Sequence, residues 1–187
     1  MRITISGPPG SGKTTVCRLV GERLGLEVVI SGDIFRQLAR EASLPLAKFG
    51  SMCELDPEVD RRLDERMIEI ARSRDDILLE GRLTGHMLAR NGIPALKVCM
   101  IADLDVRAAR VAGREGGTAD QRKREIVERE ECEARRYCSY YNIDIKDRNI
   151  YDLVIDTTSK TPEQVADLIC DAAVRGHLLR GLASGIY

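Results

Sequence analysis

Short apolar runs separated by longer amphipathic segments dominate the pattern of hydrophobic and polar positions along this chain. The first run covers residues 2–6, and the others lie at 27–31, 77–80, 95–101 and 151–156. Apolar runs of this length, bounded by residues that favour turns, are typical of buried β-strands. The pattern therefore predicts five strands.

Between these runs, apolar residues recur three or four positions apart, which is the spacing of one face of an α-helix. Two helix starts are marked by a cap residue followed by proline, at Asp56-Pro57 and Thr161-Pro162. Residues 43–56 read as a mixed stretch, and residues 175–187 as a weakly ordered tail. The predicted helices cover about 13–24, 33–42, 57–74, 84–90, 105–114, 119–141 and 161–174.

Strands that alternate with helices along a chain are typical of an α/β protein with a central parallel sheet. The chain has 187 residues, of which 43% are hydrophobic. This length suits one packed domain, so we expect residues 1–187 to fold as a single unit. Because ligands of such sheets bind at the carboxyl ends of the strands, the residues that follow each strand are the first candidates for chemistry.

The segment after the first strand matches the phosphate-binding P-loop, G-x-x-x-x-G-K-[ST]. Its glycines allow the backbone to curl into a nest whose N–H groups point at an anion, and the following helix directs its positive dipole end at the same charge. Lys13 is expected to reach the β- and γ-phosphates, and the Thr14 hydroxyl to ligate Mg²⁺. The predicted nucleotide-binding residues are Gly7, Pro8, Pro9, Gly10, Ser11, Gly12, Lys13, Thr14 and Thr15.

Charged residues also follow the second and third strands. Glu80 ends an apolar strand, where an acid can hold a water on Mg²⁺ or position an acceptor, and Gly81-Arg82 follow it. Asp33 and Arg36 lie after the second strand, although Asp33 alone could be a simple helix cap. The guanidinium groups of Arg36 and Arg82 would converge on one sheet edge, where they can bind a second anionic group. We therefore expect an anion site beside the P-loop.

The stretch 107–136 contains nine basic and seven acidic residues. Most of these are expected to form a salt-bridged, solvated helix surface. Gly113 and Gly116-Gly117 interrupt the stretch and predict a hinged flap that could bring arginines over a triphosphate. Such a flap would neutralise the transferring phosphoryl group and exclude water from it. The candidate flap arginines are Arg110, Arg114, Arg129, and Arg135 or Arg136.

The composition of the chain excludes some classes of binding partner. The formal net charge is -1 and aromatic residues make up 4% of the chain, which argues against nucleic acid or an anionic membrane as a partner. The six cysteines show no paired spacing, as expected for reduced thiols, and a zinc site is not expected. Neither a signal peptide nor an apolar run of membrane-spanning length is apparent. We expect a cytoplasmic protein that acts as a monomer.

The order of these motifs resembles the nucleoside monophosphate kinases. More narrowly, Glu80-Gly81-Arg82, Arg129-Glu130, Arg135-Arg136-Tyr137 and the run 151–157 are similar to the short, archaeal-type cytidylate kinases. The resemblance extends from Met1 to about Val174. It implies a three-layer P-loop NTPase fold with two small insertions, a monophosphate-binding part at about 33–74 and a lid at about 107–136.

The resemblance also implies a reaction. ATP would occupy the P-loop, and its γ-phosphoryl group would pass to CMP, and to dCMP, with Mg²⁺ as cofactor. Lys13, Arg110, Arg114, Arg129 and Arg135 would be catalytic. The residues implied in binding the monophosphate are Asp33, Arg36, Glu80, Gly81, Arg82 and Arg136. No general base is required, because a phosphate monoester is mostly a dianion at neutral pH.

The sequence also allows other functions. Adenylate kinases usually carry aspartate where Glu80 stands, which argues against that activity, but adenylate, shikimate and dephospho-coenzyme A kinases share the P-loop. A P-loop ATPase that acts as a switch in RNA processing is a further alternative. Turnover of CMP, dCMP, UMP and AMP, compared side by side, would distinguish these functions.

Overall fold

The computed structural model describes residues 1–45, 49, 52 and 56–183. In this part of the chain the sheet is five-stranded and all its pairings are parallel. The strand order is β2-β3-β1-β4-β5, so the first strand lies at the centre. The predicted α/β class and parallel sheet are confirmed. The strands are β1 (Arg2–Ser6), β2 (Glu27–Ile30), β3 (Ile77–Glu80), β4 (Leu96–Ile101) and β5 (Leu153–Asp156).

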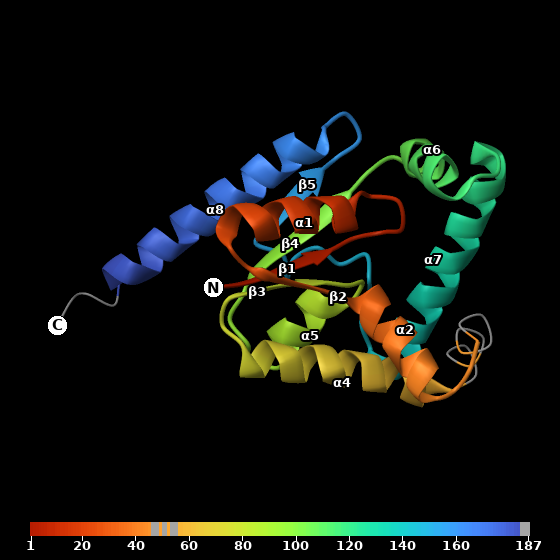
Figure 1. The fold of residues 1–187 in the computed structure, drawn as a ribbon, viewed down its shortest axis with the longest axis horizontal. Coiled ribbons are helices and arrows are strands. Elements are labelled where there is room, and N and C mark those ends of the chain that lie inside the picture. Colours follow the sequence, from red (N-terminus) through yellow and green to blue (C-terminus); the bar gives the residue numbers. More distant parts are fainter. Residues whose placement is uncertain (46–48, 50–51, 53–55, 184–187) are drawn as a thin grey trace.

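Helices cover both faces of the sheet and give three layers (Figure 1). Helices α1 (Lys13–Leu24) and α8 (Pro162–Ala183) pack together on one face, and α4 (Pro57–Ser73) and α5 (Thr84–Arg90) pack on the other. Helix α2 (Ser31–Glu41) and the packed pair α6 (Leu104–Glu115) and α7 (Ala119–Tyr141) extend beyond the carboxyl ends of the strands. They enclose the space above the sheet edge.

Alternation along the strands divides the core into two layers. Ile3, Ile5 and Leu78 are fully buried on the side of α1 and α8. Ile77 and Leu79, which flank Leu78 in sequence, are buried against α4 and α5. Neighbouring residues of a strand point to opposite faces, so an unbroken apolar run serves both layers.

The register of the sheet places the ends of neighbouring strands together. Ile5 of β1 lies opposite both Glu80 of β3 and Val98 of β4, and Ile30 of β2 also pairs with Glu80. Glu80 therefore projects from the same sheet edge as the loop that follows β1. The chain runs from β1 to β2 and β3 on one side of β1, and then from β3 to β4 on its other side, so the carboxyl end of β1 lies at a topological switch point.

Most element bounds agree with the predictions to within two residues, and the Asp56 cap is confirmed by its hydrogen bond from the Glu58 N–H at 2.9 Å. The predicted tail is wrong in part, because α8 continues to Ala183. Residues 175–183 contain Leu, Arg and Ala, which favour helix, and Gly176 and Gly181 do not end it. Much of the mixed stretch 43–56 lies outside the described residues. No helix in the described part of the chain is long and apolar enough to cross a membrane.

Candidate active site

The loop after β1 has the backbone of a phosphate nest. Gly7, Gly10 and Gly12 all have positive φ, at 149°, 79° and 90°. A Cβ at Gly7 would lie 2.1 Å from the Met100 carbonyl oxygen, and one at Gly10 would lie 2.7 Å from that of Arg107. Only glycine fits at these two positions, because β4 and α6 press directly against the loop.

Lys13 begins α1 and is held over this loop. Its Nζ donates a hydrogen bond to the Pro8 carbonyl at 3.0 Å and lies 3.8 Å from Glu80 Oε1. Burial lowers the pKa of Lys13, and the nearby Glu80 carboxylate opposes that shift. A buried ammonium with one ion-pair partner among the described residues is well placed to bind a phosphate.

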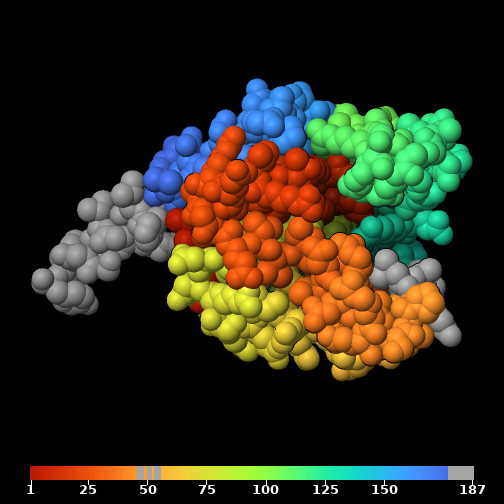
Figure 2. Space-filling view, viewed as in Figure 1, coloured from red at the N-terminus to blue at the C-terminus, as the bar shows by residue number. Residues whose placement is uncertain are grey.

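A cleft of about 1020 Å³ opens above the loop, and its hollow is visible in Figure 2 between α2 in orange and the green α6–α7 pair. This volume lies at the upper end of the range for small-molecule sites, roughly 300–1,000 Å³. The cleft thus has room for more than one small ligand. The residues predicted from the sequence that line this cleft are Pro9, Gly10, Gly12, Lys13, Thr14, Thr15, Asp33, Arg36, Glu80, Gly81, Arg82, Arg114, Arg129 and Arg136.

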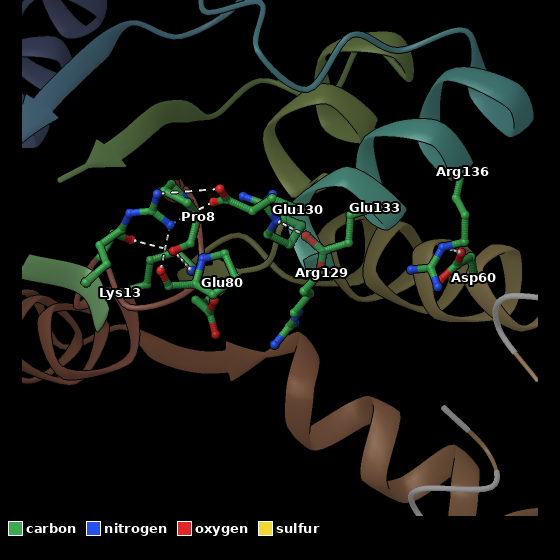
Figure 3. A network of polar contacts seen from close by, with 12 residues as sticks. Pro8, Lys13, Asp60, Glu80, Arg129, Glu130, Glu133 and Arg136 are labelled. Atoms are coloured by element: carbon green, nitrogen blue, oxygen red, sulfur yellow. Dashed lines mark hydrogen bonds and ion pairs between the residues drawn. The ribbon is translucent and has the colours of Figure 1, made fainter. Parts of the chain in front are cut away.

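Two cleft arginines share one buried carboxylate. Glu133 of α7 is 4% exposed and accepts hydrogen bonds from Arg82 at 2.6 Å and from Arg129 at 2.8 Å. Burial alone would raise the pKa of Glu133, but the two guanidinium groups hold it below the usual value. Glu133 therefore fixes both cations at the wall of the cleft, and Figure 3 shows this cluster beside Lys13 and Glu80.

Asp33 is not the cap of α2, because the helix begins at Ser31 with Ile30 at its N-cap, and Asp33 instead forms an exposed ion pair with Arg36. Across the cleft, Arg136 Nε lies 3.2 Å from Asp60 Oδ2 of α4. Burial raises the pKa of Asp60, and the Arg136 charge opposes that shift. The wall between α4 and α7 therefore carries a second charged pair.

Two predicted flap arginines do not line the cleft. Arg110 donates instead to the Thr157 carbonyl at 2.6 Å and to its hydroxyl at 3.1 Å, and that hydroxyl donates to the Ser11 carbonyl of the P-loop. Arg135 is exposed. It lies six positions after Arg129, which turns its side chain to another face of α7, whereas Arg136 at seven positions shares the inward face.

Several site residues escaped the sequence analysis. Arg107 is buried beneath the P-loop, where it donates to the Pro9 carbonyl at 3.2 Å and pairs with Glu130 at 2.8 Å. Asp64 of α4 also lines the cleft and accepts a hydrogen bond from the Tyr141 hydroxyl at 2.7 Å. The prediction that the acids of 107–136 lie on a solvated surface is wrong for Glu133. Glu133 lies four residues after Arg129, and this helical spacing was the one feature of the sequence that could have placed it beside that arginine.

Oxygen donors suitable for Mg²⁺ are present in the cleft. The Thr14 hydroxyl and the Glu80 carboxylate both line it at the carboxyl edge of the sheet, and oxygen is the donor that Mg²⁺ prefers. In the described residues no group of three or more His, Cys, Asp or Glu side chains could hold a metal without a ligand's help. Mg²⁺ typically binds with few protein ligands and with substrate phosphates, so these residues fit that mode.

A phosphate nest at the sheet's switch point, facing a second set of cations across one cleft, defines the class of P-loop phosphotransferases. The chain belongs to the cytidylate kinase-like family, whose model matches residues 2–159. It is 46% identical to the cytidylate kinase of Methanosarcina barkeri over 90% of this chain and 94% of that protein. It is 49% identical to the cytidylate kinase of Methanothrix thermoacetophila over 84% and 88% of the two chains.

Solved structures share the same architecture. Shikimate kinase from Acinetobacter baumannii, in complex with shikimate, has a TM-score of 0.62 at 19% identity and covers 94% of this chain and 93% of its own. An uncharacterized protein from Eubacterium ventriosum has a TM-score of 0.71 at 17% identity, with 92% and 97% covered. At these identities the likeness supports the P-loop kinase fold alone.

Proposed function

We propose that this protein transfers the γ-phosphoryl group of ATP to CMP, and also to dCMP, to give CDP or dCDP and ADP. The observation that carries the proposal is the pairing of a P-loop with a second group of cations across one cleft, in a chain of the cytidylate kinase-like family. An acceptor that itself bears a phosphate explains why Arg36, Arg82 and Arg129 line the same cleft as the P-loop lysine.

In this proposal the two nucleotides enter the cleft from opposite ends. The P-loop N–H groups and Lys13 bind the β- and γ-phosphates of ATP, and Arg36 and Arg82 bind the phosphate of CMP. Mg²⁺, held through Thr14 and Glu80, supplies charge neutralisation on the triphosphate when it is bound. Arg114 and Arg129 compensate the charge of the transferring group. Catalysis is then positioning and electrostatic stabilisation, because the acceptor oxygen is already ionised.

We assign Arg110, Arg107 and Arg135 other duties. The contact of Arg110 with Thr157, which in turn holds the P-loop carbonyl of Ser11, supports a role in positioning the nucleotide loop. Arg107 supports the same loop from below. Arg135 has no cleft contact that would support a catalytic role.

We assign residues 33–74 as the monophosphate-binding part and residues 107–136 as the lid. The lid is proposed to move about its turn at Gly116-Gly117. These glycines have positive φ, 78° and 82°, and join α6 to α7. Closure of the lid would exclude water from the γ-phosphoryl group.

The experiment that tests this proposal compares acceptors at fixed ATP and Mg²⁺. CMP, dCMP, UMP, AMP and shikimate are supplied one at a time, and both ADP and the phosphorylated product are measured. We expect CMP and dCMP to have the highest kcat/KM, with one CDP or dCDP formed per ADP. A preference for AMP or shikimate would overturn the assignment. Steady ATP hydrolysis without a phosphorylated product would favour the switch ATPase instead.

A further inference from the structure

The end of the cleft farthest from the P-loop carries a charged pair that phosphate binding does not explain. Asp60 of α4 and Arg136 of α7 face each other there, and both line the cleft. Arg136 lies two helical turns beyond Arg129, about 10 Å along α7 at the rise of an α-helix. Figure 3 shows this pair apart from the cluster of Lys13, Glu80, Arg129 and Glu133. The separation leaves room for a sugar between a phosphate and the pair.

This pair is buried and incompletely partnered. The Asp60 side chain is 8% exposed and that of Arg136 is 17% exposed. Asp60 Oδ2 and Arg136 Nε lie 3.2 Å apart, yet each is buried without a hydrogen-bond partner among the described residues. Buried polar atoms in folded proteins nearly always have such a partner. The two charges therefore compensate each other as an ion pair without a hydrogen bond, which leaves hydrogen-bonding capacity for a polar ligand.

The walls around the pair suit a flat, largely apolar ring. Leu63 and Met67 follow Asp60 at helical spacing on the inward face of α4, and Phe35 of α2 and Tyr137 of α7 also line the cleft. Such side chains accept the faces of an aromatic base, while a few polar groups read its edge. The arrangement is that of a base-binding pocket.

We infer that Asp60 is the residue that selects cytosine in the acceptor nucleotide, with its carboxylate accepting a hydrogen bond from the exocyclic amino group. Arg136 positions that carboxylate and favours its ionised form. This inference rests on the proposed function, since it takes the acceptor to be a nucleoside monophosphate. Nothing in the phosphate-binding chemistry above requires it.

Cytosine and uracil differ in one hydrogen-bonding group that a carboxylate can distinguish. Cytosine presents an amino donor at the position where uracil presents a carbonyl acceptor. An ionised carboxylate is an acceptor only, so it binds the amino group of cytosine and repels the carbonyl oxygen of uracil. A neighbouring guanidinium is a donor only, and it suits the ring acceptors of cytosine. Asp60 and Arg136 together therefore match cytosine and oppose uracil.

Asp64 is the competing carboxylate on the same helix. It differs from Asp60 because the Tyr141 hydroxyl already donates a hydrogen bond to it. Oδ2 of Asp64 thus has a hydrogen-bond donor within the protein, whereas Oδ2 of Asp60 has an ion-pair partner but no hydrogen bond. This contrast is why we assign base selection to Asp60.

The test compares the wild type with Asp60→Asn, using the ratio of kcat/KM for CMP to that for UMP. An asparagine amide can donate to the uracil carbonyl, so the substitution weakens CMP and improves UMP. Because a hydrogen bond to a charged group is at stake, we expect the ratio to fall by about 10- to 100-fold. Glu65→Gln, the same chemical change on the exposed face of α4, is the matched control and is expected to keep the wild-type ratio.

Ribose 5-phosphate, which lacks a base, separates base reading from a general defect. Its inhibition constant against CMP is expected to be the same in the wild type and in Asp60→Asn. If Asp60→Asn leaves Arg136 unpaired and fails to fold, the double variant Asp60→Asn with Arg136→Gln removes both charges and is measured in the same way.

An unchanged CMP-to-UMP ratio would overturn the inference, and so would an equal loss of CMP and ribose 5-phosphate binding. A shift of the ratio in Asp64→Asn but not in Asp60→Asn would assign the role to the other carboxylate and also overturn it. In each of these cases a wild type that phosphorylates CMP leaves the proposed function standing. A wild type that does not phosphorylate CMP would overturn the proposed function itself.

Discussion

The buried carboxylate of Glu133 offers a sharp perturbation of the cation cluster. Replacing it in Glu133→Gln keeps the shape of the side chain and removes the negative charge between Arg82 and Arg129. The Arg82 side chain is 15% exposed and contacts Glu133 at 2.6 Å, so its charge would be left in a poorly solvated site. Arg129 is 63% exposed, and water can compensate its charge.

The size of the effect follows from these exposures. Removing one partner of a buried ion pair destabilises a protein by roughly 3–5 kcal/mol. The exposed contact with Arg129 adds only about 0–1 kcal/mol. Because the glutamine oxygen can still accept one hydrogen bond, we expect a loss of about 3 kcal/mol in the free energy of unfolding, near the lower end of the buried-pair range.

Urea unfolding, with and without inorganic pyrophosphate, measures this loss. An anion bound at the arginines replaces the missing charge, so pyrophosphate should stabilise Glu133→Gln more than it stabilises the wild type. Glu131→Gln changes an exposed acid of the same helix and serves as the control. If Glu133→Gln is as stable as Glu131→Gln, or gains no more than the wild type from pyrophosphate, the reasoning about the shared counter-ion is refuted.

Four further changes test other parts of the account. Lys13→Ala should lower kcat by at least about 10²-fold, because a preorganised charge on the phosphoryl group is lost, while circular dichroism shows an unchanged fold. Arg36→Ala should raise KM for CMP by about 10-fold or more and leave KM for ATP unchanged, in steady-state assays of both substrates. Shortening residues 113–118 should raise ATP hydrolysis in the absence of CMP, because an incomplete lid admits water. Burial raises the pKa of Asp64 to about 7, although the Tyr141 hydroxyl opposes the shift. The folded state thus disfavours its ionised form, and stability is expected to fall by about 2–4 kcal/mol as pH rises from about 4 to 7. Asp64→Asn should flatten that decline in urea unfolding measured across this pH range.

Each of these four predictions has a result that would contradict it. Full activity of Lys13→Ala would remove the P-loop lysine from the reaction, and unchanged KM for CMP in Arg36→Ala would remove Arg36 from the acceptor site. A shortened lid with no added hydrolysis would argue against water exclusion. Parallel pH profiles for the wild type and Asp64→Asn would place the Asp64 carboxyl in water.

The sequence was most informative where local rules decide the structure. The strand runs, the Asp56 cap and the 119–141 helix depend on periodicity and capping, which act over a few residues. The P-loop is similarly local, because its glycines are required by close contacts such as that of Gly7 with Met100. These features could be predicted from one chain.

The electrostatics of the cleft could not be predicted in the same way. Glu133 is one of seven acids in 107–136, and only the packing of α7 against the β3–α5 loop shows that it meets Arg82. Arg110 and Arg135 were expected over the triphosphate because the rotation of each helix about its own axis was unknown. Asp60 and Arg136 come from helices distant in sequence, so no spacing indicated their contact.

A crystal structure with a bisubstrate analogue, in which a polyphosphate joins adenosine to cytidine, tests the central claim most directly. We expect the adenosine-side phosphates in the P-loop at Lys13, and the cytidine-side phosphate beside Arg36 and Arg82, with Asp33 at the same edge. A cytidine bound elsewhere on the protein, away from these residues, would contradict the account.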